Sequence, residues 1–124
     1  MDNLIISGSN QTPTVKLQRG LIEISGRSIP EDPVAFYRPV MEWLNQYVEN
    51  LPEFTQINLQ FEYINTSSSK ALHNILKTLN DKVDESHRME INWFYEEGDD
   101  DMFELGQFFE PYLRIPIKYI QTEE

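Results

Sequence analysis

The chain has 124 residues and a formal net charge of −11, from 21 acidic and 10 basic side chains. This length allows one domain with a single core, expected over residues 1–124, and a hydrophobic content of 40% excludes a disordered chain. The acidity disfavours binding to nucleic acid or to an anionic membrane, and the absence of cysteine excludes disulfides and thiolate chemistry.

The first residues show no secretory leader, because Met1-Asp2-Asn3-Leu4 lacks a basic segment followed by an apolar run. No apolar stretch approaches the roughly 20 residues of a membrane-spanning helix. We therefore expect a soluble, cytoplasmic protein.

Short strands open the chain. Residues 4–6 form an apolar run that suits an edge strand or an ordered arm. Residues 14–18 and 21–25 are strand candidates on either side of Arg19-Gly20. This arrangement predicts a β-hairpin.

A long helix is predicted next. Asp32-Pro33 is typical of a helix start, and apolar residues then recur at helical spacing as far as Leu51. Pro39 falls inside this stretch, so the helix either kinks there or begins at Pro39. Trp43, on or beside the apolar stripe, is expected in the core, and so is Trp93 further along the chain.

Three later segments alternate apolar and polar residues, the pattern of strands with one buried face. They span residues 55–63, 88–95 and 115–120. Helices with one apolar stripe are predicted between them, over residues 68–83 and 100–112. A sheet covered on both faces would have nearly continuous apolar strands. The sequence therefore predicts an α/β fold, a two-layer domain whose mixed β-sheet carries its helices mainly on one face.

Four consecutive hydroxyl side chains stand where the second helix should begin, in the stretch Asn65-Thr66-Ser67-Ser68-Ser69-Lys70. The amino end of a helix offers unpaired N–H groups and a partial positive charge, which suit a capping hydroxyl and equally a phosphate. Capping by Thr66 or Ser67 accounts for one or two of the four hydroxyls. The surplus indicates a phosphoacceptor, whose phosphate would gain from the helix dipole and from Lys70.

Other chemistries find little support. His73 is expected on the polar side of that helix and His87 in a polar loop, without the paired ligands of a metal site. A serine hydrolase using Ser67 or Ser68 with His73 would need a glycine-flanked nucleophile, which is absent. The acidic segment 96–101 lacks EF-hand spacing, and no nucleotide-binding glycine motif is present. We therefore expect no catalytic residue, no metal and no cofactor.

The stretch Tyr63-Ile64-Asn65-Thr66-Ser67-Ser68-Ser69-Lys70 resembles the SiaC family of bacterial regulatory phosphoproteins. The likeness spans nearly the whole chain, and Asn-Thr-Ser-Ser between a strand and a helix is its most specific part. Weaker supporting matches are Thr12-Pro13, Pro30-Glu31, Trp43 and Trp93-Phe94-Tyr95. The resemblance implies a fold like the STAS domain of anti-sigma-factor antagonists, and a partner-switch protein rather than an enzyme.

In this family a dedicated kinase phosphorylates the threonine of Asn-Thr-Ser-Ser, and a PP2C-type phosphatase reverses the modification. The resemblance therefore implies that Thr66 is the phosphoacceptor and that Asn65, Ser67, Ser68 and Lys70 form the partner-binding surface around it. In the characterised system the unphosphorylated form binds and activates a diguanylate cyclase, so a downstream target of this kind is expected. The alternative is a constitutive protein-interaction or anion-binding module in which the hydroxyl turn is only a helix N-cap.

Overall fold

The computed structural model describes residues 2–123 as a six-stranded sheet with three α-helices and one short 3-10 helix. In chain order the elements are β1 (Leu4–Ile6), β2 (Thr14–Gln18), β3 (Leu21–Ser28), α1 (Pro33–Tyr47), β4 (Phe54–Ile64), α2 (Thr66–Asn80), β5 (Arg88–Glu96), α3 (Asp100–Phe109), η1 (Glu110–Tyr112) and β6 (Ile117–Thr122).

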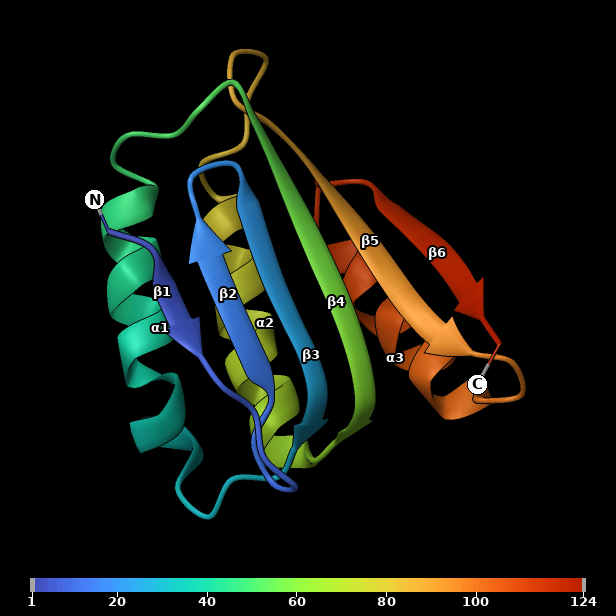
Figure 1. The fold of residues 1–124 in the computed structure, drawn as a ribbon. Helices are drawn as coiled ribbons and strands as arrows, with labels where there is room; N and C mark the ends of the chain where they lie inside the picture. The colour runs from blue at the N-terminus through green and yellow to red at the C-terminus, as the bar shows by residue number, and fades with distance from the viewer. Residues whose placement is uncertain (1, 124) are drawn as a thin grey trace.

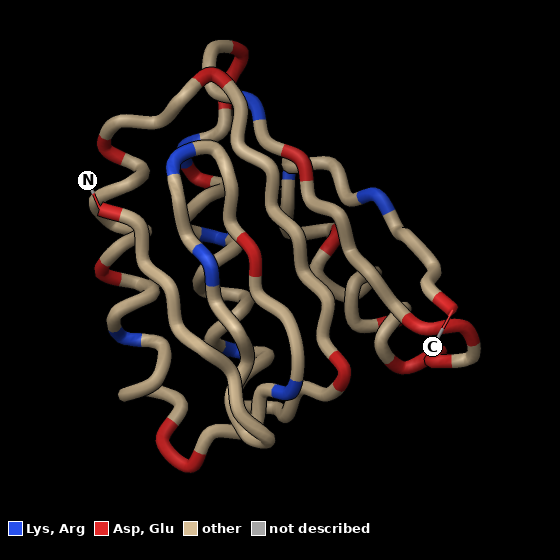
Figure 2. Tube along the Cα trace, viewed as in Figure 1, with Lys and Arg blue, Asp and Glu red and all other residues tan. Residues whose placement is uncertain are grey.

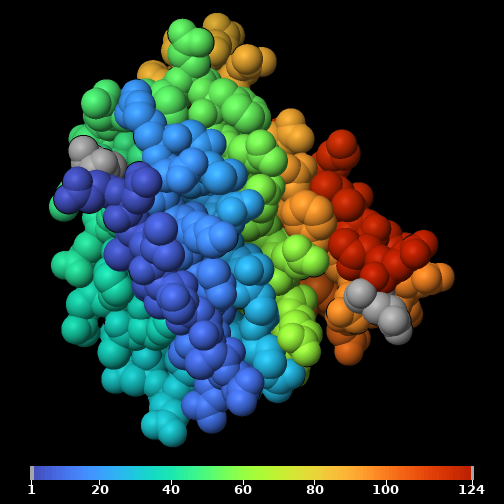
Figure 3. Space-filling model, in the orientation of Figure 1, coloured from blue at the N-terminus to red at the C-terminus, as the bar shows by residue number. Residues whose placement is uncertain are grey.

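The strands lie side by side in chain order (Figure 1). The first three are antiparallel neighbours, whereas β3, β4, β5 and β6 run parallel, and a helix forms each parallel crossover. All three α-helices cover the same face, and the view onto the other face shows mainly strands (Figures 1 and 3). Within residues 2–123, none of the helices has the length and hydropathy that a membrane span requires.

The two faces of the sheet differ as the alternating pattern predicts. Ile57 and Leu59 of β4 are buried in the core beneath the helices. Asn58, between them, donates to Glu23 Oε2 at 2.9 Å and accepts from Asn92 Nδ2 at 2.9 Å, so polar side chains of neighbouring strands join across the other face. The predicted two-layer α/β fold with helices on one face is therefore confirmed.

The opening strands form as predicted, with one extension. Residues 4–6 pair with β2 as an edge strand rather than an arm. Beyond the predicted hairpin, β3 continues from Ser25 to Ser28 through an irregularity between Gly26 and Arg27. Gly26 has φ +108°, a left-handed conformation that glycine adopts at little cost. This extension carries Ser28 to the start of α2.

The first helix begins directly after its cap. Asp32 Oδ1 accepts the N–H of Ala35 at 3.0 Å, and the helix continues through Pro39, so a helix start at Pro39 is wrong. The cap fixes the start, and Pro39 lies on the exposed side, where water can hydrogen-bond the carbonyl group that is left without an N–H partner. Trp43 and Trp93 are 8% and 1% exposed, which confirms both as core residues.

The last strand begins at Ile117 rather than Ile115 because the end of α2 holds the preceding backbone. Asn80 Oδ1 accepts the backbone N–H groups of Arg114 at 2.7 Å and of Ile115 at 3.2 Å. The Arg114 guanidinium in turn donates to the Asn80 carbonyl oxygen at 2.8 Å. Upstream, the predicted third helix also ends early, at Phe109, where η1 follows.

We expect Asn80→Ala to lower the free energy of unfolding by about 2 kcal/mol, because two backbone N–H groups lose their acceptor. Asn74→Ala, on the exposed side of the same helix, is the matched control and should change this free energy by less than about 0.5 kcal/mol. Urea denaturation followed by circular dichroism measures both. Equal, small effects would contradict the role assigned to Asn80.

Candidate functional site

The amino end of α2 is capped by Asn65, which stands directly before the helix. Its Oδ1 accepts the N–H of Ser68 at 2.9 Å, and its carbonyl oxygen accepts the N–H of Ser69 at 2.9 Å. The prediction that Thr66 or Ser67 caps the helix is wrong, and so is the helix start at Ser68. Asparagine is among the strongest N-caps, and its position moves the helix start forward to Thr66.

Thr66 and Ser67 are exposed in the first turn of α2. Their backbone N–H groups donate to no other group within residues 2–123, so they add to the positive end of the helix. Lys70 is also exposed and lies one turn after Thr66, a spacing that puts both on one side of the helix. This arrangement can accommodate a negative group at Thr66.

Ser68 points into the protein and is 0% exposed. Ser28 Oγ, at the end of β3, donates to Ser68 Oγ at 2.8 Å and forms a 2.6 Å hydrogen bond with the hydroxyl of Tyr37. Burial raises the pKa of Tyr37 above its ordinary value, and hydrogen bonds with Ser28 and Ser68 oppose this rise. The prediction that Ser68 lies on the partner-binding surface is therefore corrected, because its hydroxyl contacts Ser28 rather than solvent.

A groove of about 600 Å³ lies between α2 and α3, and Thr66 is among its lining residues. Two aromatic side chains on one side of this groove are largely exposed to solvent: Phe108 and Tyr112 are each 61% exposed. Clusters of exposed aromatic side chains are typical of protein-interaction surfaces. We call this the α2–α3 groove; its lining residues are Thr66, Ser69, Lys70, His73, Asn74, Leu105, Phe108, Phe109 and Tyr112.

His73 forms part of this groove rather than of a polar helix face, which corrects the prediction. Its ring centroid lies 6.0 Å from that of Phe109 and 5.6 Å from that of Tyr112. No hydrogen bond joins His73 to a hydroxyl group in the described part of the chain, and Ser68 is turned toward Ser28 instead. The geometry therefore provides no serine–histidine pair for hydrolysis.

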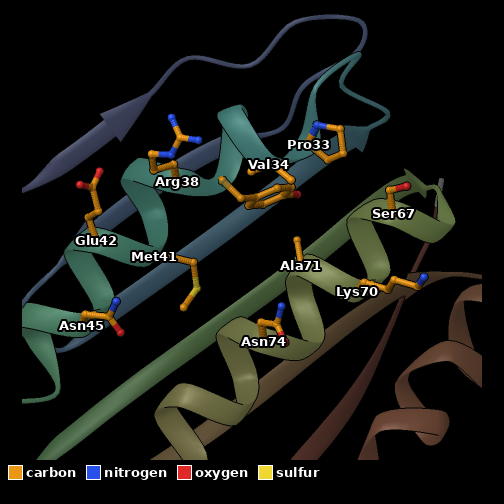
Figure 4. Close-up of a pocket in the computed structure, with 11 residues that line it drawn as sticks. Pro33, Val34, Arg38, Met41, Glu42, Asn45, Ser67, Lys70, Ala71 and Asn74 are labelled. Carbon is orange, nitrogen blue, oxygen red and sulfur yellow. The ribbon is translucent and has the colours of Figure 1, made fainter.

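A second groove, of about 490 Å³, lies on the other side of α2, against α1. Met41 of α1 and Ala71 of α2 face each other across it, and Ser67 lies near the amino end of α2 (Figure 4). The Lys70 side chain extends away from α1 (Figure 4). Thr66 and Ser67, although adjacent in the chain, therefore line different grooves.

Acidic positions outnumber the basic ones, but residues 63–80, which include all of α2, hold none (Figure 2). Among residues 2–123, no group of three or more His, Cys, Asp or Glu side chains could hold a metal ion. In the acidic segment before α3, Asp99 Oδ1 accepts the N–H of Met102 at 3.1 Å. This aspartate therefore serves as a helix cap.

Sequence reasoning missed two parts of this region. Ser28 and Tyr37 lie far from α2 in the chain, and nothing in their local pattern indicates contact with it. Phe108 left a usable signal, because it lies off the apolar stripe that Met102, Leu105 and Phe109 form at helical spacing. Phe109 is 2% exposed, which leaves Phe108 at the surface.

The family model described as SiaC family regulatory phosphoprotein matches residues 6–122. An uncharacterized protein of Pseudomonas aeruginosa (strain UCBPP-PA14) is 26% identical over 118 residues, which cover 94% of each chain.

Solved structures show the same fold. Apo-SiaC from Pseudomonas aeruginosa is 24% identical, with a TM-score of 0.87 over 97% of this chain and 99% of that one. SiaC in complex with the diguanylate cyclase SiaD, which it activates, is also 24% identical, with a TM-score of 0.86 over 96% and 99% of the two chains. Since the family model covers nearly all of the sequence, this chain belongs to the SiaC family of regulatory phosphoproteins and is a regulatory protein rather than an enzyme.

Proposed function

We propose that this protein is a cytoplasmic signalling switch set by reversible phosphorylation of Thr66. A cognate serine/threonine kinase adds the phosphoryl group, a PP2C-type phosphatase removes it, and the unphosphorylated form binds a downstream partner. The observation that carries the proposal is the exposure of Thr66 at the first position of α2, beside an apolar groove. Membership of a family of regulatory phosphoproteins supports it.

Accessibility separates the four hydroxyl groups. Ser68 is buried and Ser69 half-buried, whereas Thr66 and Ser67 are exposed. A kinase needs a hydroxyl group that its active site can reach, so only Thr66 and Ser67 meet the requirement. Thr66 is the stronger candidate because it lines the groove with the exposed aromatic side chains.

The local electrostatics suit a phosphate at this position. Phosphorylation adds about two negative charges and three acceptor oxygens. The free N–H groups of Thr66 and Ser67 and the ammonium group of Lys70 are the nearest positive groups on the same turn or the next. None of these groups belongs to the core, so the fold can accept the modification unchanged.

The α2–α3 groove explains how phosphorylation of Thr66 could affect partner binding. A partner that packs on Phe108 and Tyr112 would also cover Thr66. A phosphate there would have to lose its hydration without gaining an equivalent set of donors. Phosphorylation should therefore oppose binding, and the unphosphorylated form should be the active one.

The partner class follows from the family. SiaC from Pseudomonas aeruginosa is the activator of the diguanylate cyclase SiaD in their complex. We assign a downstream partner of the same class to this protein.

A second candidate function is anion binding without phosphoryl transfer. The N–H groups of Thr66 and Ser67 lack acceptors within residues 2–123, and they would suit a free anion as well as a covalent phosphate. Calorimetric titration with inorganic phosphate tests this candidate. Tight binding by a protein that no kinase modifies would favour it.

Treatment with the cognate kinase and Mg-ATP should place one phosphoryl group on Thr66, because its side chain is exposed. A PP2C-type phosphatase should then remove it. Intact-mass and tandem mass spectrometry give the stoichiometry and the site. Thr66→Val should abolish the modification, whereas Ser67→Ala, which removes the neighbouring exposed hydroxyl, should retain it. Modification at another residue would overturn the assignment.

Thr66→Asp should weaken binding of the downstream cyclase at least about tenfold, or roughly 1.4 kcal/mol, because it puts a charge beneath the docked partner. Ser86→Asp adds the same charge in the exposed loop after α2, at the other end of that helix, and should leave the affinity unchanged. Isothermal titration calorimetry measures both. The proposed mechanism would be wrong if neither Thr66→Asp nor phosphorylation of Thr66 changed the affinity for the cyclase.

Phe108→Ala should weaken the same complex about tenfold or more, because exposed aromatic side chains in a groove often dominate binding energy. The matched control is Ile5→Ala, which truncates an apolar side chain 67% exposed on β1, far from the groove. Both variants should keep the wild-type free energy of unfolding within about 0.5 kcal/mol. Equal affinity of the two variants for the cyclase would place the docking surface elsewhere.

A further inference from the structure

We propose that Ser28 is a positioning residue for phosphorylation of Thr66, although it contributes nothing to the exposed surface. This inference rests on the proposed function, in which Thr66 is the phosphoacceptor. Ser28 ends β3 and is 0% exposed. It joins three separate elements at the point where α2 begins.

Three hydrogen bonds converge on Ser28. Its Oγ donates to Ser68 Oγ at 2.8 Å and bonds the hydroxyl of Tyr37 at 2.6 Å. Its carbonyl oxygen accepts the backbone N–H of Asn65 at 3.1 Å. Asn65 in turn accepts the N–H of Ser68. The cap and the first turn of α2 are therefore tied to both β3 and α1 through one residue.

These bonds fix the rotation of the first turn about the helix axis. Successive residues of an α-helix are separated by about 100°, so a side chain held inside determines where its neighbours point. With Ser68 held against Ser28, Ser67 lines the groove beside α1 and Thr66 lines the α2–α3 groove. A small rotation would move the Thr66 hydroxyl away from the groove.

This rotation matters because Thr66 belongs to a regular helix rather than to a loose loop. A kinase must therefore recognise the folded turn as it stands, and its reaction requires the acceptor oxygen close to the ATP phosphorus. Displacement of a reacting group by about 1 Å can cost about a hundredfold in rate. Ser28 thus acts through the turn that it orients and not through contact with the reacting atoms.

The chain contains a matched control for the loss of a buried hydroxyl. Thr55 is 1% exposed, and its Oγ1 forms a 2.6 Å hydrogen bond with the hydroxyl of Tyr47. This pair repeats the chemistry of Ser28 and Tyr37 at the start of β4, whereas α2 follows the end of that strand. Thr55→Ala therefore measures what the loss of a buried hydroxyl from a tyrosine pair does to stability, and only Ser28→Ala, which also loses the bond to Ser68, should affect Thr66.

The test compares phosphorylation kinetics of the folded proteins with the cognate kinase and Mg-ATP. We expect Ser28→Ala to lower kcat about tenfold, because the hydroxyl is misplaced within the bound complex. Simple loss of folded substrate would instead raise the apparent KM. Thr55→Ala should keep the wild-type kcat. Tyr37→Phe, which removes one hydroxyl from the same network, provides a second variant should Ser28→Ala fail to fold.

A second measurement needs no kinase. In both network variants, the amide protons of Ser68 and Ser69 should exchange at least about fivefold faster by NMR, while the amide of Leu76 in the middle of α2 should not change. Wild-type kcat or wild-type exchange in the folded network variants would overturn the inference. A wild-type protein left unmodified at Thr66 would instead count against the proposed function, and the exchange rates would still decide whether Ser28 orients the turn.

Discussion

The start of α2 depends on a division between an inner side, where every polar group is satisfied, and an outer side left to solvent. On the inner side, Ser28, Asn65 and Ser68 bond one another within the protein. On the outer side, the N–H groups of Thr66 and Ser67 find no acceptor among residues 2–123. Buried polar groups must be paired because an unmade hydrogen bond costs about 1–3 kcal/mol, whereas exposed groups can exchange water for another ligand. One helical turn can therefore support the core and still carry a removable charge.

The position of α2 between two other helices gives its two sides different surroundings. The groove beside α1 and the groove beside α3 each take residues from α2, and Lys70 and Asn74 line both. A group attached to Thr66 lies on the α3 side, where Phe108 and Tyr112 are exposed. A change at this position would act first on that groove, and on the groove beside α1 only through the shared Lys70 and Asn74. The fold thus offers two neighbouring surfaces that share part of one helix.

Local pattern was enough to predict the layers of the fold but not the contacts that shape the site. Alternation along β4 and β5 records burial directly, so the one-sided sheet could be read from the sequence. The cap was misassigned because asparagine, serine and threonine compete for one position, and only the helix start decides among them. Ser28 and Ser68 are 40 residues apart, and their hydrogen bond depends on the parallel pairing of β3 with β4. No short-range pattern records such a contact.

The few charges near Thr66 affect a phosphate at this position more than the net charge of −11 does. Charges exposed to solvent are screened beyond about 8 Å at physiological ionic strength, and residues 63–80, which include all of α2, contain no carboxylate side chain. A phosphate at the first position of the helix would meet mainly the helix amino end and Lys70, one turn away. These groups would stabilise the phosphate in the free protein. A partner that covers Thr66 would then have to remove water from this charged phosphate. The same negative charge would therefore favour the phosphorylated form of the free protein and weaken binding of its partner.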